Sequence, residues 1–220
     1  MVIDGLINAL PQLMDGLVVT ILLTFFSLIL ATVLGIVLAV GRSYGGRIIS
    51  FVVYLYEKIF RGIPLLVLFF LIYFGLTQVG INLDPFPAAI LGLALRSAAY
   101  QSQIFRGAIN SIPHGQTMAA YSLGMSRFQT IREIILPQVL RLSIPGWSNE
   151  LTIVLKDTSI AFSIGVVELM RQGRYIYSLD FNMVLPILLL IAVIYFVIVF
   201  SINKGLGYLE KKYKILGLSI

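Results

Sequence analysis

Two stretches of this chain contain no charged residue over the length of a membrane-spanning helix. Residues 17–40 and 183–202 are uncharged throughout, and a helix that rises 1.5 Å per residue needs about 20 apolar residues to cross a hydrocarbon layer of about 30 Å. Composition agrees, since 59% of the 220 residues are hydrophobic and only 12% are charged, against about 25% in soluble domains. These observations exclude a soluble globular protein and predict an all-α membrane protein with a single transmembrane domain, residues 1–220.

Three further apolar runs are interrupted by polar residues. They cover about residues 52–76, 86–109 and 143–167, and each contains two or three charged residues. A charge at the centre of a bilayer costs about 3 kcal/mol on insertion scales, so such residues face a cavity or a partner. The sequence therefore predicts five transmembrane helices, of which the three middle ones enclose a polar route.

Basic residues in the connecting segments predict the orientation of the chain. Most of them lie on one side of a five-helix count: Arg42, Arg47, Arg127, Arg132, Arg141, Lys204, Lys211, Lys212 and Lys214. The other side carries Asp4, Asp15 and Asp84, with Arg171 and Arg174 as the exceptions. Because cytoplasmic loops are enriched in Lys and Arg, the N-terminus is predicted outside and the C-terminus in the cytoplasm. The net charge of +6 is attributed to this orientation and not to nucleic-acid binding.

Proline and glycine predict two breaks in the helices. Pro11 and Gly16 indicate a short interfacial helix before the first span. In the second span, Arg61 and Gly62 are followed closely by Pro64. Proline removes a backbone donor and bends the chain, and arginine reaches the interface or caps exposed carbonyls. This segment is predicted to be a kink, and a structural role is favoured over direct contact with a substrate.

The fourth span carries the candidates for a substrate site. Lys156 and Asp157 are adjacent, so on an α-helix they point about 100° apart and do not easily neutralise each other. Either each has another partner or the helix is interrupted, and the run from Asp157 to Ser159 consists of good N-cap residues for a half-helix that restarts there. Such a half-helix would present backbone N–H groups to an anionic substrate group, whereas a structural ion-pair network is the alternative. Asn149 and Glu150 are further candidates for a polar pocket.

The segment between the third and fourth spans, residues 115–137, is too polar to cross a membrane and is named the 115–137 loop below. Residues 118–123 predict a short helix that Gly124 ends with a positive φ, and Ser126 is placed to cap a second helix. Apolar residues recur in that second helix at about 3.6 residues: Phe128, Ile131, Ile134 and Ile135. Two interfacial helices on the lipid headgroups, or a knob that docks into a cytoplasmic partner, both fit this pattern.

This loop resembles the EAA loop of bacterial ATP-binding-cassette (ABC) transporter permeases. The matching residues are Ala119, Ala120, Gly124, Ile134, Leu136 and Pro137, and Arg127 lies among them. Residues 61–67, 104–109 and 155–159 also resemble the polar amino-acid uptake branch of that family. Met118 stands where the acidic residue that names the loop is found, so docking is expected to rest on the apolar and glycine framework.

The resemblance implies the fold and the partners of a type I ABC importer. It implies a five-span permease that pairs with a second copy or a close relative and binds a cytoplasmic ABC ATPase dimer through the 115–137 loop. An extracytoplasmic binding protein is expected to deliver a polar amino acid to it. The expected location is the cytoplasmic (inner) membrane of a bacterium or archaeon, and the chain is expected to be a transport subunit, not an enzyme.

The chain itself lacks an ATP-binding motif. Gly41 and Gly46 have the spacing of a P-loop but are not followed by Lys and Ser or Thr, so ATP is expected in the partner subunit and no cofactor in this chain. Cysteine is absent and His114 is the only histidine, so no metal site is expected. The residues alone also allow a self-sufficient ion-coupled secondary transporter or channel. A membrane enzyme is disfavoured because no nucleophile–base pair accompanies the carboxylates.

Overall fold

The computed structural model describes residues 2–213, and every regular element within them is helical. In chain order the elements are α1 (Val2–Tyr44), α2 (Arg47–Gly62), α3 (Leu65–Phe70), η1 (Leu71–Gly75), α4 (Leu76–Gln78), α5 (Pro85–Ser111), α6 (His114–Ser122), α7 (Arg127–Gln129), η2 (Thr130–Ile135), α8 (Leu136–Leu142), α9 (Ile144–Asp157), η3 (Thr158–Ile164), α10 (Leu169–Leu179), η4 (Phe181–Met183) and α11 (Val184–Tyr213). The elements η1 and η2 are π-helical, and η3 and η4 are 3-10 helices. The all-α class is confirmed. Lys214, one of the predicted orientation charges, lies outside the described residues.

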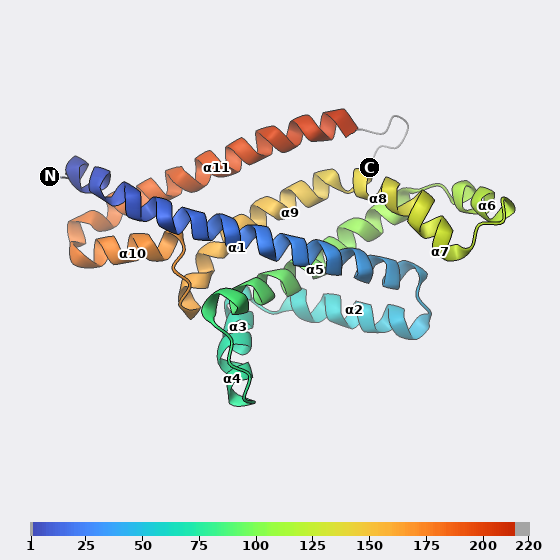
Figure 1. The fold of residues 1–220 in the computed structure, drawn as a ribbon, viewed down its shortest axis with the longest axis horizontal. Helices are drawn as coiled ribbons and strands as arrows, with labels where there is room; N and C mark the ends of the chain where they lie inside the picture. The colour runs from blue at the N-terminus through green and yellow to red at the C-terminus, as the bar shows by residue number, and fades with distance from the viewer. Residues whose placement is uncertain (1, 214–220) are drawn as a thin grey trace.

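Small side chains let α1 and α5 lie close together along much of their length (Figure 1). Ala31 of α1 is buried against Ala94 and Ala98 of α5. A Cβ added at Gly35 of α1 would lie 2.8 Å from the Cβ of Gln101, so this contact requires glycine. Because helices in lipid associate by close van der Waals packing, this seam of small residues fixes α5 against α1.

The predicted break before the first span is wrong, because α1 continues through Pro11 without interruption. The first turns of α1 are held by tertiary packing: Leu13 is fully buried in a cluster with Leu169 and Ile187. Gly16 marks a close crossing instead of a helix end. A Cβ at Gly16 would lie 2.9 Å from the Cα of Leu169.

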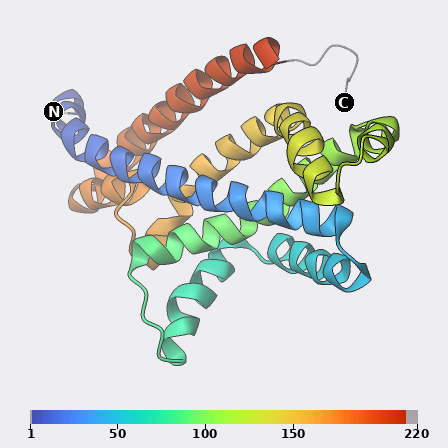
Figure 2. The same cartoon turned by 45° about the vertical axis from the view of Figure 1, so that its right-hand side comes forward.

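Helix α2 and the helical segment that follows it meet at a sharp bend. Arg47–Gly62 and Leu65–Gln78 are inclined by 105° to each other, and Ile63 between them is extended, with φ −83° and ψ 128°. Pro64 then precedes α3, where a missing N–H costs no intrahelical bond. As a result, α3 and α4 project sideways from the bundle (Figure 2).

Within the described residues, two helices are long and apolar enough to cross a membrane by themselves: Asp4–Tyr44 and Phe181–Tyr208. The bent pair formed by α2 and α3–α4 gives a third candidate if it counts as one span. Helix α5 is long but carries two arginines, and α9 has only 14 residues before η3 extends it. The count of five spans therefore stays a prediction, in which α5 and the α9–η3 segment supply the remaining two.

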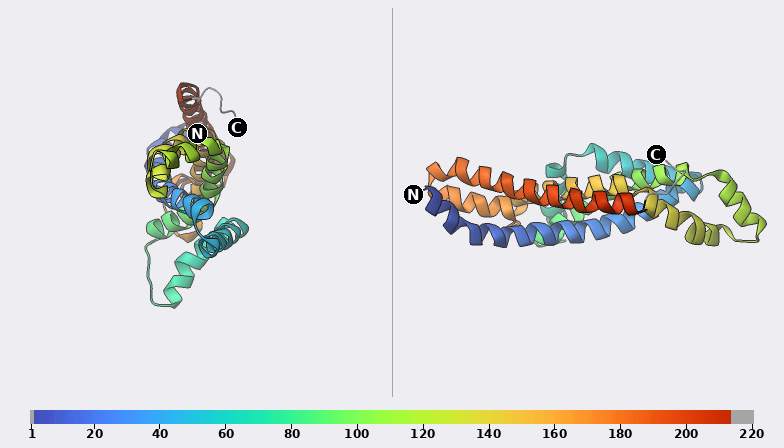
Figure 3. Two further views of the ribbon diagram at one scale, coloured as in Figure 1. Left: turned by 90° about the vertical axis from the view of Figure 1, so that its right-hand side faces the viewer. Right: turned by 90° about the horizontal axis from the view of Figure 1, so that it is seen from above.

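The bundle is elongated, and two structures of different character occupy its ends (Figure 3). Helices α6 and α7 of the 115–137 loop lie at one end, and α10 lies at the other, beside the first turns of α1. The polar residues of α5 and α9 lie between these ends.

Candidate functional site

A buried carboxylate on α9 is held by a chain of hydrogen bonds from α5 and α1. Glu150 is 3% exposed, and the Ser97 hydroxyl donates to its Oε1 at 2.7 Å. Gln101 donates to the Ser97 oxygen at 3.2 Å and accepts from Thr32 at 2.9 Å. The Trp147 indole donates to Thr32 at 3.0 Å. Since a buried polar group without a partner is costly, this network both fixes Glu150 and joins three helices.

About two turns further along α9, Asp157 pairs with Arg96 of α5. The Arg96 Nη1 and Asp157 Oδ2 lie 2.5 Å apart, and both side chains are about a quarter exposed. The Arg96 guanidinium also lies 5.2 Å from the ring centroid of Tyr100, whose ring carries a second cation, Arg61, at 4.9 Å. Lys156 is exposed. Asp157 thus finds its partner on another helix, so the first of the two outcomes holds for Asp157, whereas Lys156 faces outward.

The predicted restart of a half-helix near Ser159 is wrong. Helix α9 passes at Asp157 into the 3-10 helix η3, and the backbone turns only at Gly165, with φ +106°. The Ser159 hydroxyl donates to the Lys156 carbonyl at 2.7 Å, so it does not cap a new helix. The next helix is α10, and its N-cap is Glu168, whose carboxylate accepts two backbone N–H bonds. Ala161 and Ile164 of η3 are buried in the apolar core of the bundle, and the segment stays helical up to Gly165.

The remaining sequence candidate on α9, Asn149, is exposed, and its backbone carbonyl accepts a hydrogen bond from the Thr152 hydroxyl at 2.8 Å. The structure therefore does not bring Asn149 into the network of Glu150. It does add a residue that sequence reasoning left unassigned: Glu57 of α2 is 2% exposed and accepts from Ser102 at 2.8 Å.

The partners on α5 were also missed as site residues, although a signal for them exists. Arg96 and Tyr100 are four residues apart, as are Ser97 and Gln101, and residues at this spacing share one face of a helix. One face of α5 therefore turns toward Asp157 and the other toward Glu150. Together, Arg96, Ser97, Glu150 and Asp157 form what is named the α5–α9 polar site below. It offers fixed charges of both signs inside the bundle.

The 115–137 loop is built from short helices with defined ends. Gly124 has φ +80°, which favours glycine, and it follows α6 as the sequence predicts. Ser126 and Gln129 form a reciprocal capping box at the start of α7. The second helix does not keep a regular period of 3.6 residues, because η2 is π-helical, and it continues through Pro137 to Leu142. Ile135 is consequently buried while Phe128 is 70% exposed.

Contacts with α1 and α5 hold this loop on the bundle. The Arg127 guanidinium donates to the Tyr44 carbonyl and lies 5.7 Å from the centroid of its ring. Gln138 donates to Gln116 at 2.6 Å, which joins α8 to α6. The buried apolar cluster beneath them is formed by Ala39, Phe105, Ala108, Ile112, Ile135, Val139 and Leu142. Ala120 is buried, Ile134 and Leu136 are half-buried, and Ala119 and Pro137 are exposed.

The outer surface of the loop carries large apolar side chains. Met118 is 68% exposed, Leu123 83% and Phe128 70%. Large exposed apolar side chains on a segment too polar to cross the membrane are typical of a surface that binds a partner or the lipid headgroups.

Known proteins resemble this chain over nearly its full length. Residues 31–215 match the family described as binding-protein-dependent transport system inner membrane component. The probable amino-acid permease protein YxeN of Bacillus subtilis strain 168 is 38% identical over 208 residues, which cover 92% of each chain. The glutamine transport system permease protein GlnP of Escherichia coli K12 is 37% identical over 210 residues, covering 94% of this chain and 95% of GlnP.

A solved structure agrees with these sequence matches. The crystal structure of an amino acid ABC transporter with histidines contains a chain that is 33% identical and superposes with a TM-score of 0.86. The match covers 96% of the present chain and 98% of that chain.

Proposed function

Because the chain belongs to the family of binding-protein-dependent transport system inner membrane components, as a permease subunit of an amino-acid ABC importer, we propose that it carries a polar amino acid by alternating access. The observation that carries the importer role is the near-complete match to amino-acid permeases, which spans both the polar interior and the 115–137 loop. The self-sufficient carrier or channel is correspondingly disfavoured.

The 115–137 loop is the proposed docking site for a cytoplasmic ABC ATPase dimer, which would bind and hydrolyse ATP. Its exposed apolar surface of Met118, Leu123 and Phe128 supports this, because an apolar knob with defined caps suits insertion into a cleft on a partner. The pattern left interfacial helices as the alternative, and family membership favours docking. The residues Ala119, Ala120, Gly124, Arg127, Ile134, Leu136 and Pro137 would shape and hold this knob.

The substrate is proposed to pass the α5–α9 polar site. A zwitterionic amino acid needs an anion for its ammonium group and a cation for its carboxylate, and Glu150, Asp157, Lys156 and Arg96 supply both signs. Asn149 and Ser159 lie near these residues in the chain, on α9 and η3, and would offer polar groups to a passing substrate, although the structure leaves both outside the hydrogen-bond network of Glu150. The kink at Arg61, Gly62 and Pro64 would serve a structural role next to the site, since Arg61 stacks on Tyr100.

Three further parts complete the proposed importer: a second permease copy, identical or closely related, an extracytoplasmic binding protein, and the inner membrane of a bacterium or archaeon. In this arrangement, ATP-driven closure of the ATPases pushes the docked loops together. The motion would reach the polar site through α8 and α9, because both elements follow the loop directly in the chain.

Reconstitution tests the proposal. The chain is co-expressed with its ATPase, and the complex is placed in liposomes that contain ATP inside or outside. Uptake of an amino acid should require both ATP and an extracytoplasmic binding protein. Uptake by the chain alone under an ion gradient would instead establish a secondary transporter.

A further inference from the structure

Two arginines on α10 occupy the side of the molecule where the orientation rule predicts few basic residues. Arg171 and Arg174 lie at the end of the bundle opposite the 115–137 loop (Figure 3). If that loop faces the cytoplasm, α10 faces outward. Cations that run against the positive-inside rule do not serve orientation, so they call for another function.

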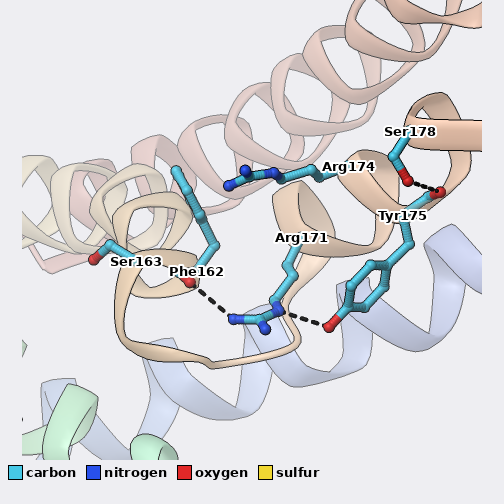
Figure 4. Close-up of a pocket in the computed structure, with 6 residues that line it drawn as sticks. All are labelled: Phe162, Ser163, Arg171, Arg174, Tyr175 and Ser178. Atoms are coloured by element: carbon cyan, nitrogen blue, oxygen red, sulfur yellow. Dashed lines mark hydrogen bonds between the residues drawn. The ribbon is translucent and has the colours of Figure 1, made fainter. Parts of the chain in front are cut away.

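The two guanidinium groups line a pocket of about 430 Å³ between η3 and α10 (Figure 4). The residues that form this basic pocket are Phe162, Ser163, Arg171, Arg174, Tyr175 and Ser178. Arg171 is fixed, because its Nη1 donates to the Phe162 carbonyl at 3.0 Å and its Nε donates to the Tyr175 hydroxyl at 2.7 Å. Arg174 lies 5.9 Å from the centroid of the Phe162 ring, and its residue is exposed.

Among residues 5–208, no carboxylate forms an ion pair with either arginine. Glu168, the nearest acid along the chain, is fully buried and is occupied by the backbone N–H groups of Met170 and Arg171. The pocket therefore combines two cations with the Tyr175 hydroxyl, and its six lining residues include no anion. The Ser178 hydroxyl already donates to the Tyr175 carbonyl at 2.8 Å, and the Ser163 oxygen is buried. Guanidinium and hydroxyl donors of this kind suit a carboxylate.

We propose that the basic pocket receives an aspartate or glutamate side chain of the extracytoplasmic binding protein when that protein docks on the permease. This inference rests on the proposed function, since it presupposes such a partner. A free amino acid is a poorer occupant, because its ammonium group would meet two arginines and no carboxylate. An acidic side chain brings only the charge that the pocket can accept.

The pocket is also joined to the α5–α9 polar site by a single short element. The 3-10 helix η3 starts directly after Asp157 and carries Phe162 and Ser163 near its other end. A carboxylate that binds Arg171 would compete for the guanidinium group that donates to the Phe162 carbonyl. Docking outside would thereby act on the backbone about 10 Å from the Arg96–Asp157 pair, since Phe162 follows Asp157 by five residues that each rise about 2 Å.

The test uses the complete permease–ATPase complex in nanodiscs and the binding protein that stimulates its ATP hydrolysis. The concentration of binding protein that gives half-maximal stimulation is measured for the wild type, Arg174→Glu, Arg174→Gln and Arg174→Lys. Arg174 is chosen over Arg171 because the Arg171 guanidinium holds the Phe162 carbonyl, so that a change there would disturb η3 itself. Asn182→Asp is the matched control for Arg174→Gln, since it changes the charge by the same amount on an exposed residue outside the pocket.

Charge reversal should raise the half-maximal concentration about tenfold and neutralisation about threefold, with Arg174→Lys near the wild type and basal hydrolysis unchanged. Salt should weaken stimulation of the wild type more than that of Arg174→Gln. The inference is overturned if Arg174→Gln and its matched control Asn182→Asp behave alike while the wild type is stimulated. Stimulation that is absent even in the wild type overturns the proposed function as well. If the Arg174 substitutions change only basal hydrolysis, and only in nanodiscs that contain anionic lipid, the inference is overturned and a lipid phosphate is identified as the occupant.

Discussion

The turn inside the 115–137 loop and the α5–α9 polar site are shaped by contacts of different range. In the loop, Gly124 and the Ser126–Gln129 capping box act between residues within a few positions of each other. In the polar site, Arg96 and Asp157 are 61 positions apart, and Ser97 and Glu150 are 53 apart. The loop is therefore shaped locally and is exposed to a partner, whereas the polar site exists only when α5 and α9 are packed together. Changes in the loop should uncouple the protein, and changes in the site should affect both its stability and its transport.

The largest effect is expected for Gly124→Val. A β-branched residue does not readily adopt φ +80°, so the turn between α6 and α7 would be forced into another shape. A Cβ there meets no atom within 4 Å, so the bundle itself should be unaffected. ATP-driven uptake in proteoliposomes should fall at least tenfold, while the yield of inserted protein and its thermal midpoint stay near the wild type.

Gly115→Val is the matched control for this change. Gly115 lies in α6 without a positive φ, and a Cβ there also has open space. Uptake should change less than twofold. Equal losses in both variants would contradict the role given to the Gly124 conformation and point to bulk on the docking surface.

Arg96→Gln should lower both stability and transport. It leaves the Asp157 carboxylate partly buried without its cation, which costs about 2 kcal/mol of the free energy of unfolding for a charged hydrogen bond. Transport should fall about tenfold. The thermal midpoint of the detergent-solubilised complex and the initial rate of uptake measure the two effects.

The double variant Arg96→Gln with Asp157→Asn separates these effects. Two neutral amides leave no unpaired charge, so most of the lost stability should return, whereas transport should stay low because the site has lost charges of both signs. Recovery of transport together with stability would mean that the pair is purely structural.

Glu150→Gln and Ser97→Ala should separate transport from stability. Glu150→Gln should lower uptake and keep the fold, whereas Ser97→Ala should lower stability. In the Glu150→Gln variant, the oxygen of the new side-chain amide would still accept the Ser97 hydrogen bond. This variant should therefore keep the fold and reduce uptake about tenfold if the negative charge binds the ammonium group. Ser97→Ala leaves a buried carboxylate with one donor fewer, which costs about 1–2 kcal/mol. Unchanged uptake by Glu150→Gln would remove this residue from the route.

The smallest effect is expected for Ser126→Ala. Loss of the capping box costs about 1 kcal/mol, and the cost falls on the first turn of α7 alone. Amide hydrogen exchange should accelerate in α7, and coupling of ATP hydrolysis to uptake should weaken about twofold. Ser111→Ala, which removes a hydroxyl bonded to a carbonyl at the end of α5, is a suitable control. Faster exchange throughout the bundle would contradict a local role.

The same difference in range explains how far the sequence could predict the molecule. The C-terminal end of α6 and the start of α7 follow from glycine and serine chemistry that acts over three or four residues, and they were predictable. The start of α6 at His114, four residues before the predicted start, was not. The partners of Glu150 and Asp157 were not, because the register between α5 and α9 depends on packing that no local pattern records. The continuity of α1 through Pro11 is a similar case, since the buried Leu13 outweighs the local preference for a break.

The π-helical turn η2, between α7 and α8, has a consequence for how docking geometry could change. A π-helical turn accommodates one residue more than an α-helical turn, and one residue corresponds to a rotation of about 100° around the helix axis. The direction in which Phe128 faces is thus set by chain length within Thr130–Ile135. Deleting a single residue there would rotate the docking surface relative to α8, so that it faced a different cleft while every docking side chain stayed the same.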